Sequence, residues 1–210
     1  MYVPPEFVAS DSDDVRRIVE ANPLATVVGA GGGKIVATHV PVVPTYEDGR
    51  LVALACHVAR ANTHWKAIAG DVLVIFRGVE SYITPGWYPS KVETGKVVPT
   101  WNYEAVHVNG TARAIDDTAW LARHVADVTD RFEAPQSAPW ATSDAPERYM
   151  EVMLRGIVGV EIAVTSIDAK IKASQNKTED DRRGVIEGLS ERADPSARAM
   201  AALVARDLKR

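Results

Sequence analysis

Residues 96–110 place side chains capable of hydrogen bonding and proton transfer inside a run that is typical of a β-strand. A buried strand would ordinarily carry Val and Ile at such positions. The run instead supplies two hydroxyls, an indole, an amide and an imidazole, from Thr100, Trp101, Asn102, Tyr103 and His107. A strand that gives up core-forming residues for such a cluster usually lines a binding site. The alternative is a polar outer face on an edge strand.

A second cluster, residues 57–65, joins a predicted strand to a predicted helix. Asn62 is a good helix N-cap, so we expect a short helix from Asn62 to Gly70. Arg60 stands just before it. Free N–H groups at a helix start, together with the Arg60 guanidinium, would bind a phosphate or another anion. The alternative is a solvated Arg60 and a surface His64.

Two loops add further candidates. The long loop 82–91 holds Trp87 and Tyr88, which could wall a flat cofactor, pack across a dimer interface or only cap an open barrel end. Residues 170–177 end the last predicted strand with Lys, Ser, Gln and Asn. These side chains suit an oxygen-rich ligand, a carbonyl edge or a phosphate, unless they are simply a polar strand exit.

The histidines are spread over the predicted strands. His39, His57 and His107 fall in three different strands, and their spacing matches no zinc or haem motif. A lone histidine on a strand is more often a hydrogen-bonded structural residue than a ligand.

Composition places the chain among ordinary globular proteins. It has 210 residues, 46% of them hydrophobic and 25% charged, enough for one domain or one domain with an appendage. The single cysteine, Cys56, excludes an intrachain disulfide and indicates a small buried residue. A net charge of −4 argues against a broad nucleic-acid-binding face. We find no secretory signal or membrane-spanning run, so we expect a soluble, cytoplasmic protein.

The hydrophobic pattern predicts an α+β fold dominated by antiparallel strands. Glycine-rich turns at 31–33 and 47–49 predict hairpins, so the first three strands should form a meander. Hairpin-connected strands of this kind favour a small closed or split barrel. The six predicted strands span residues 24–29, 35–43, 51–58, 72–83, 97–115 and 156–167.

Helices flank this barrel. We expect one over residues 12–20 and a long one from Asp117, with Leu121, Val125, Val128 and Phe132 on its apolar face. A further helix opens at Pro146 and should turn Tyr149, Met150, Met153 and Leu154 inward. Thr178-Glu-Asp-Asp181 and Asp194-Pro195 are typical helix starts, so residues 177–210 predict two more helices. We therefore divide the chain into a barrel domain, 1–176, and a helical C-terminal extension, 177–210, which packs on the barrel or on a second subunit.

Several motifs, read in order, resemble the PaiB family of FMN-binding negative transcriptional regulators. The similarity spans roughly residues 1–190, and its most specific block is Pro99-Thr-Trp-Asn-Tyr103. The other matching segments are Ala37-Thr-His-Val-Pro41, His57-Val-Ala-Arg-Ala-Asn62, Tyr82-Ile-Thr-Pro85, Trp87-Tyr-Pro-Ser-Lys91, Ala105-Val-His-Val108 and Ser174-Gln-Asn176.

The resemblance implies a split β-barrel of the flavin reductase and pyridoxamine-phosphate-oxidase type, and a homodimer with FMN at the interface. It also implies that residues 57–62 hold the FMN phosphate near Thr38 and His39, and that residues 100–103 flank the flavin. The cofactor-binding residues predicted in this way are Thr38, His39, His57, Arg60, Asn62, Trp87, Tyr88, Lys91, Thr100, Trp101, Asn102, Tyr103, Lys172, Ser174, Gln175 and Asn176.

The function implied by the resemblance is repression of degradative-enzyme and sporulation genes. DNA binding rests on the resemblance alone, since the sequence shows neither a helix-turn-helix nor a basic recognition helix. An FMN-dependent oxidoreductase or flavin reductase is the first alternative, because a bound flavin is redox-active. A haem-binding split barrel that uses His39, His57 and His107 is the second. No acid–base dyad stands out, so we assign no catalytic residue.

Overall fold

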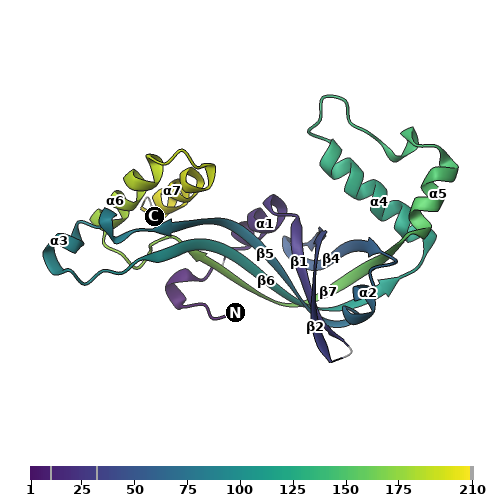
Figure 1. Cartoon of the computed structure of the whole chain (residues 1–210), viewed down its shortest axis with the longest axis horizontal. Coiled ribbons are helices and arrows are strands. Elements are labelled where there is room, and N and C mark those ends of the chain that lie inside the picture. The colour runs from purple at the N-terminus through teal and green to yellow at the C-terminus, as the bar shows by residue number, and fades with distance from the viewer. Residues whose placement is uncertain (10, 32, 209–210) are drawn as a thin grey trace. The chain divides into compact units, whose positions relative to one another are not determined.

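The structure is a computed structural model that describes residues 1–9, 11–31 and 33–208 (Figure 1). Seven strands are described: β1 (Leu24–Gly31), β2 (Lys34–Pro41), β3 (Val43–Glu47), β4 (Arg50–Ala59), β5 (Gly70–Ile83), β6 (Thr100–Ile115) and β7 (Ile157–Lys172). The α-helices are α1 (Ser12–Ala21), α2 (His64–Ala67), α3 (Ser90–Thr94), α4 (Thr118–Glu133), α5 (Glu147–Arg155), α6 (Glu179–Ser190) and α7 (Pro195–Leu208). Single 3-10 turns are η1 (Pro5–Phe7), η2 (Pro85–Trp87) and η3 (Thr142–Asp144).

The strands form one sheet in the order β2-β1-β5-β6-β7-β4-β3. The β1–β2 and β3–β4 pairs are antiparallel hairpins, as predicted. The predicted meander is wrong, because Val43–Glu47 is a strand of its own. This strand pairs with β4, while β2 pairs with β1. The sheet therefore has seven strands instead of the predicted six.

The described residues divide into two compact units. Unit 1 comprises residues 1–21, 77–106 and 168–210, and unit 2 comprises residues 22–76 and 107–167. The long strands β5, β6 and β7 contribute residues to both units. The division predicted from the sequence, at residue 176, stays a prediction. No helix of the described chain is both long and apolar enough to cross a membrane.

The core of unit 2 follows the two-residue period of its strands. Ala25 and Val27 of β1 are buried, whereas Leu24 is 67% exposed, as expected when successive side chains point to opposite faces. Helix α4 begins directly after Asp117, as predicted, and buries Leu121. The Asp117 carboxylate caps the helix by accepting from the Trp120 N–H. Cys56 is buried, and burial raises the pKa of its thiol to about 12, so it is the inert core residue that we predicted.

One face of the unit 2 sheet stays apolar and open. Ile35 of β2 is 81% exposed and pairs with Ala30 of β1. Directly paired residues project from the same face, so Ala30 shares the face of Ile35. Leu24 precedes Ala30 in β1 by an even number of residues, so it lies on this face too. The face is hollowed into a groove of about 510 Å³ lined in part by Val28, Ile35 and Leu73.

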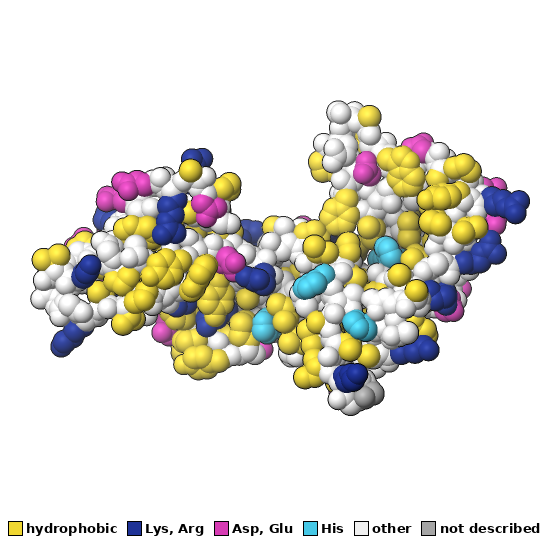
Figure 2. Space-filling view, viewed as in Figure 1, with side chains coloured by type: hydrophobic (Ala, Val, Ile, Leu, Met, Phe, Trp, Pro, Cys, Tyr) yellow, Lys and Arg dark blue, Asp and Glu magenta, His cyan; other side chains and the backbone are white. Residues whose placement is uncertain are grey.

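Helix α5 corrects one prediction. Leu154 is buried, but Tyr149 is 55% exposed and Met153 is 44% exposed. These two side chains therefore do not face inward, although both fit the apolar pattern of the sequence. Figure 2 shows hydrophobic side chains gathered over α4 and α5.

In unit 1 the C-terminal helices α6 and α7 pack on each other (Figure 1). Thr178 caps α6 by accepting from the Asp181 N–H. Helix α6 also packs on η2, where Gly184 and Gly188 leave the space that the Trp87 backbone and indole fill. A Cβ at Gly188 would lie 2.2 Å from the indole ring.

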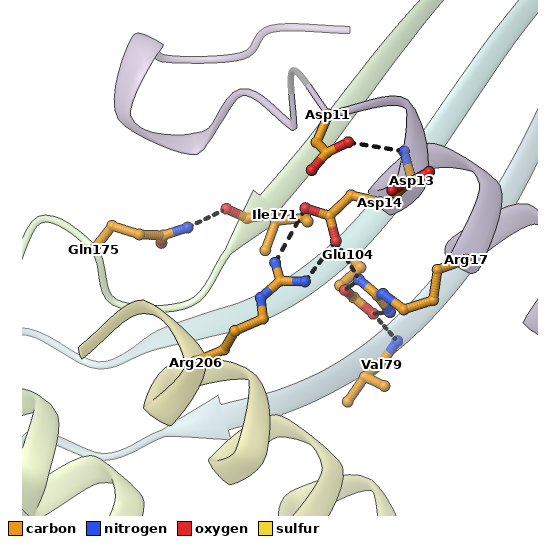
Figure 3. Close-up of polar contacts among 9 residues, drawn as sticks. All are labelled: Asp11, Asp13, Asp14, Arg17, Val79, Glu104, Ile171, Gln175 and Arg206. Carbon is orange, nitrogen blue, oxygen red and sulfur yellow. Dashed lines mark hydrogen bonds and ion pairs between the residues drawn. The ribbon is translucent and has the colours of Figure 1, made fainter. Parts of the chain in front are cut away.

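A chain of ion pairs ties α1 to β6 and to α7 within unit 1 (Figure 3). Arg17 pairs with both Asp14 and the buried carboxylate of Glu104, which also accepts from the Val79 N–H. Arg206 donates two hydrogen bonds to Asp14, at 2.5 and 3.2 Å. Burial alone would raise the pKa of Asp14, but Arg206 and Arg17 outweigh burial and hold this pKa below its usual value. The ionised cluster therefore fastens both ends of the chain to the sheet.

Candidate functional site

The predicted cofactor-binding residues fall into two groups, one in each unit. Unit 2 holds Thr38, His39, His57, Arg60 and Asn62, and unit 1 holds the rest. All five histidines of the chain belong to unit 2, and Figure 2 shows several of them on one face. Each group is described by itself.

Two histidines of unit 2 contact threonines. The Nδ1 atom of His64 lies 2.9 Å from the Thr38 hydroxyl, and Nδ1 of His39 lies 2.9 Å from the Thr26 hydroxyl. Thr38 is half-buried, whereas His39 is exposed. These contacts fix the ring orientations and leave each Nε2 atom for another partner.

Arg60 already has a counter-ion. Its guanidinium donates two hydrogen bonds to Asp116, and others to the carbonyls of Arg155 and Ile157. Hydrogen bonding to Asp116 raises the pKa of Arg60, and the same contact lowers the pKa of Asp116. Most of the five N–H donors of a guanidinium are therefore in use.

The helix predicted from Asn62 to Gly70 is shorter than expected. Helix α2 covers only His64–Ala67, and the Asn62 carboxamide oxygen accepts from the His64 N–H instead of opening the helix itself. A single turn carries little dipole. The anion site predicted from a helix start plus a free arginine is thus not assembled in the way that the sequence suggested.

His57 contacts a residue that the sequence analysis did not identify. Its Nδ1 atom lies 3.1 Å from Nε2 of His124, whose ring stacks on Trp120 at a centroid distance of 4.9 Å. One ring donates and the other accepts, so at least the accepting ring is neutral. Burial, with His57 adding to it, lowers the pKa of His124 to about 4, and burial also lowers the pKa of His57. His124 follows Leu121 by three residues, and this spacing could have identified it as an inward-facing side chain.

We expect the His57–His124 contact to make the protein less stable in acid. The His124 pKa rises on unfolding from about 4 to its ordinary 6.5, so the unfolded chain binds more protons in this window. Stability is full above pH 6.5 and decreases towards pH 4, by about 1 kcal/mol between pH 7.5 and 5.5. Urea unfolding at several pH values measures this slope. His124→Phe should flatten it and His39→Ala should not. An equal slope in all three proteins would contradict the assignment.

Unit 1 brings four of the predicted residues into two contacts. The Lys172 ammonium donates to the Thr100 hydroxyl, and the Asn102 amide donates to Ser174 Oγ at 2.8 Å. Asn102 and Ser174 are buried, whereas Thr100 and Lys172 are half-buried. The two contacts thus join the start of β6 to the end of β7 and the loop that follows it.

The Asn102–Ser174 contact leaves a polar atom unpaired. The buried Oδ1 atom of Asn102 has no hydrogen-bond partner within the described chain. If the oxygen and nitrogen of the Asn102 amide were assigned the other way round, the nitrogen would be the atom without a hydrogen-bond partner. Ser174 has φ of 63°, a left-handed conformation that non-glycine residues adopt mainly at turns and functional sites. A ligand that donates a hydrogen bond would complete this pair.

Gln175 and Asn176 take different positions in the loop. The Gln175 side chain donates to the Ile171 carbonyl (Figure 3). It also accepts from the Ala173 N–H, so it fixes the loop backbone. Asn176 is exposed.

The aromatic candidates are largely occupied inside unit 1. Tyr88 is 2% exposed and lies under the Lys177 ammonium, 5.1 Å from its ring centroid, while Trp87 packs on α6. The ring of Tyr103 lies 5.2 Å from the Lys170 ammonium. Trp101 is 54% exposed and contacts Tyr82 edge-on.

Lys91 is exposed on α3. Of the aromatic candidates, Trp101 has the most free ring surface and is the best placed to stack on a flat ligand.

The donor set in unit 1 fits a flavin mononucleotide better than a metal. The described residues contain no group of three or more His, Cys, Asp or Glu side chains able to hold a metal ion. The unpaired amide oxygen of Asn102 can accept from the ring N–H of an isoalloxazine, and hydroxyls and an ammonium can meet its carbonyls and phosphate.

Comparison with known proteins agrees with this chemistry. A family model described as "Putative FMN-binding domain" matches residues 1–166. The Bacillus subtilis (strain 168) protein "Protease synthase and sporulation protein PAI 2" is 34% identical over 212 residues, which cover 100% of this chain and 99% of the relative. The match extends through both units and the C-terminal helices.

Solved structures show the same fold. The FAD and heme binding protein from Mycobacterium smegmatis aligns with a TM-score of 0.59 at 17% identity, over 91% of this chain and 96% of that one. The flavocytochrome Anf3 from Azotobacter vinelandii aligns with a TM-score of 0.58 at 16% identity, over 84% and 75%. The predicted α+β split barrel with C-terminal helices is confirmed. The chain therefore belongs to the FMN-binding split-barrel family that includes PAI 2, the PaiB family.

Proposed function

We propose that this protein binds FMN and acts as a flavin-responsive regulator. The observation that carries the proposal is the cluster of Thr100, Asn102, Lys172 and Ser174, which combines an unpaired buried acceptor with an ammonium that has no carboxylate partner. Membership of an FMN-binding family supports the choice of ligand.

The cluster matches the parts of FMN by chemistry. The pyrimidine edge of the isoalloxazine carries one N–H between two carbonyls, and Asn102 Oδ1 would accept from that N–H. The bound flavin would supply reversible redox chemistry. The hydrogen bond from Asn102 holds the Ser174 loop against the amide, so we infer that this loop shifts when the ligand enters.

The regulatory role rests on the relative. PAI 2 is named for protease synthesis and sporulation, and we extend to this chain the control of degradative-enzyme and sporulation genes. Flavin reductase activity is the alternative, and oxidation of NADH or NADPH with free FMN as acceptor tests it. Haem binding is the second alternative, and a Soret band in the absorbance spectrum of the purified protein tests it.

We also propose that two chains pair through the open sheet face of unit 2. Ile35 and Leu24 are 81% and 67% exposed there. A face with large exposed side chains on paired strands commonly marks an interface. A homodimer would cover it.

Titration with FMN tests the proposal. We expect wild-type protein to quench FMN fluorescence at one flavin per chain and to scatter light as twice the 22.8 kDa chain mass. Asn102→Leu should weaken both FMN and riboflavin about 10-fold, since each loses one hydrogen bond to a buried amide. Asn109→Leu is the matched control, because Asn109 makes a similar contact with Ser166, at 3.1 Å in unit 2. Wild-type protein that leaves FMN fluorescence unchanged at millimolar concentration would refute flavin binding.

A further inference from the structure

The end of β7 and the loop after it carry three lysines without an anionic partner. Lys170, Lys172 and Lys177 lie within eight residues of sequence. No described carboxylate lies within 4.0 Å of their ammonium groups, whereas most described ion pairs involve arginines. A partly buried ammonium without a counter-ion is costly to a fold. A bound anion would remove this cost.

The three lysines differ in availability. Lys170 is 7% exposed and its ammonium is enclosed by the rings of Tyr2, Phe7 and Tyr103, at 5.2 to 5.9 Å. Lys177 lies over the Tyr88 ring. These two are held by aromatic faces and supply positive potential.

Lys172 is the lysine that remains available. Its ammonium has one hydrogen-bond partner within the described chain, the Thr100 hydroxyl, and can donate two more hydrogen bonds. Burial lowers the pKa of Lys172. Tyr103 opposes this shift, and the charges of Lys170 and Lys177 add to it. Lys170 and Lys177 therefore add positive charge near Lys172, and a bound anion would offset this charge.

Arg60, the cation expected to hold the ligand's phosphate, provides the contrast. Its guanidinium is neutralised by Asp116 and donates further hydrogen bonds to two backbone carbonyls. Moving a phosphate onto Arg60 would require breaking this ion pair. A phosphate can bind at Lys172 without breaking any ion pair.

The surroundings of Lys172 are already ordered. Gln175 pins the backbone of residues 171 and 173, and Ser174 is held in its left-handed conformation against Asn102. The Gln175 contacts fix the backbone on both sides of Lys172, which reduces the entropy lost when a phosphate binds there. Thr100 adds a hydroxyl beside the ammonium.

We propose that Lys172, together with Thr100 and with Lys177 nearby, is the seat for a phosphate monoester, and that it holds the phosphate of FMN in place of Arg60. The inference rests on the proposed function for the identity of the ligand. A phosphate monoester carries nearly two negative charges and three strong acceptor oxygens. It can accept from the Lys172 ammonium and the Thr100 hydroxyl together, while the charge on Lys177 attracts it.

Paired substitutions separate the two candidate cations. Lys172→Met should weaken FMN binding about 10- to 100-fold, the loss expected for charge-assisted hydrogen bonds. It should change riboflavin affinity less than about 3-fold, because riboflavin lacks the phosphate. Arg60→Met is the matched control and should change the affinities for FMN and riboflavin equally. A selective loss of FMN affinity in Arg60→Met, with none in Lys172→Met, would overturn the inference.

Inorganic phosphate tests the seat without flavin. Acetylation of wild-type lysines by a limiting acylating reagent, read by mass spectrometry, should show Lys172 protected by phosphate and Lys91 unprotected. Protection of Lys172 in a protein that binds no flavin would support the seat while refuting the proposed function. Flavin binding with no phosphate protection of Lys172, even at saturating phosphate, would refute the seat while supporting the proposed function. Thermal unfolding of both Met variants confirms that they are folded.

Discussion

Replacing Arg17 with methionine is expected to lower the free energy of unfolding by about 3 kcal/mol. The Glu104 side chain is 1% exposed, and Arg17 is its only described ion-pair partner. Removing one member of a buried pair leaves an uncompensated charge, which typically costs about 3–5 kcal/mol. Arg17 is 42% exposed, so we expect the lower end of this range.

Two further variants make the test specific. Arg183→Met removes an exposed pair with Glu179 on α6 and should cost less than about 0.5 kcal/mol. Adding Glu104→Gln to Arg17→Met should recover much of the loss, because Gln is neutral and can still accept from the Val79 N–H. Urea unfolding of all variants at pH 7 measures these differences. An Arg17→Met protein no less stable than Arg183→Met would show that Glu104 is not buried as a charge.

Gly184→Ala is expected to destabilise the protein by about 2 kcal/mol, against the usual preference of helices. Alanine in place of glycine normally favours a helix by about 1 kcal/mol. Here the new Cβ would lie 2.0 Å from the Trp87 carbonyl oxygen, so the backbone of η2 must move. Overpacking of this kind costs about 1–3 kcal/mol.

The test is whether Gly184→Ala lowers or raises the stability of the protein. Glu187→Ala, at an exposed position of the same helix, serves as the control and should change stability by less than about 0.5 kcal/mol. Thermal unfolding ranks the two variants against wild type. A Gly184→Ala protein that is more stable than wild type would show that α6 does not pack closely on η2.

The sequence predicted the elements whose signals are local. The apolar stripe beginning at Leu121 and the start expected at Asp117 predicted the first residue of α4 to within one residue. Thr178 likewise marked the start of α6. Strand β3 was missed because Val43–Glu47 is short, contains Pro44 and has no apolar run. Its place depends on pairing with β4, which only the folded sheet supplies.

The site was harder to predict than the fold. Residues 100–103 and 172–176 were identified by their chemistry and do lie in one unit, where Thr100 and Asn102 contact Lys172 and Ser174. The engagement of Arg60 was not foreseeable, because its partner Asp116 is 56 residues away and belongs to no local pattern. The slot for Trp87 likewise depends on glycines of α6 about one hundred residues further along the chain.

The ion pair between Asp14 and Arg206 has a consequence for the protein's synthesis on the ribosome. Its members are 192 residues apart, and the N-terminal ammonium similarly pairs with Asp168. At about 5–20 residues per second, translation would leave α1 without its C-terminal partner for roughly 10–40 seconds. Unit 1 thus completes only after the residues around Arg206 have been translated, whereas the β1–β2 hairpin can form soon after it leaves the exit tunnel. During that interval the apolar face of α1, with Ile18 and Val19, is a natural target for chaperones that bind nascent chains.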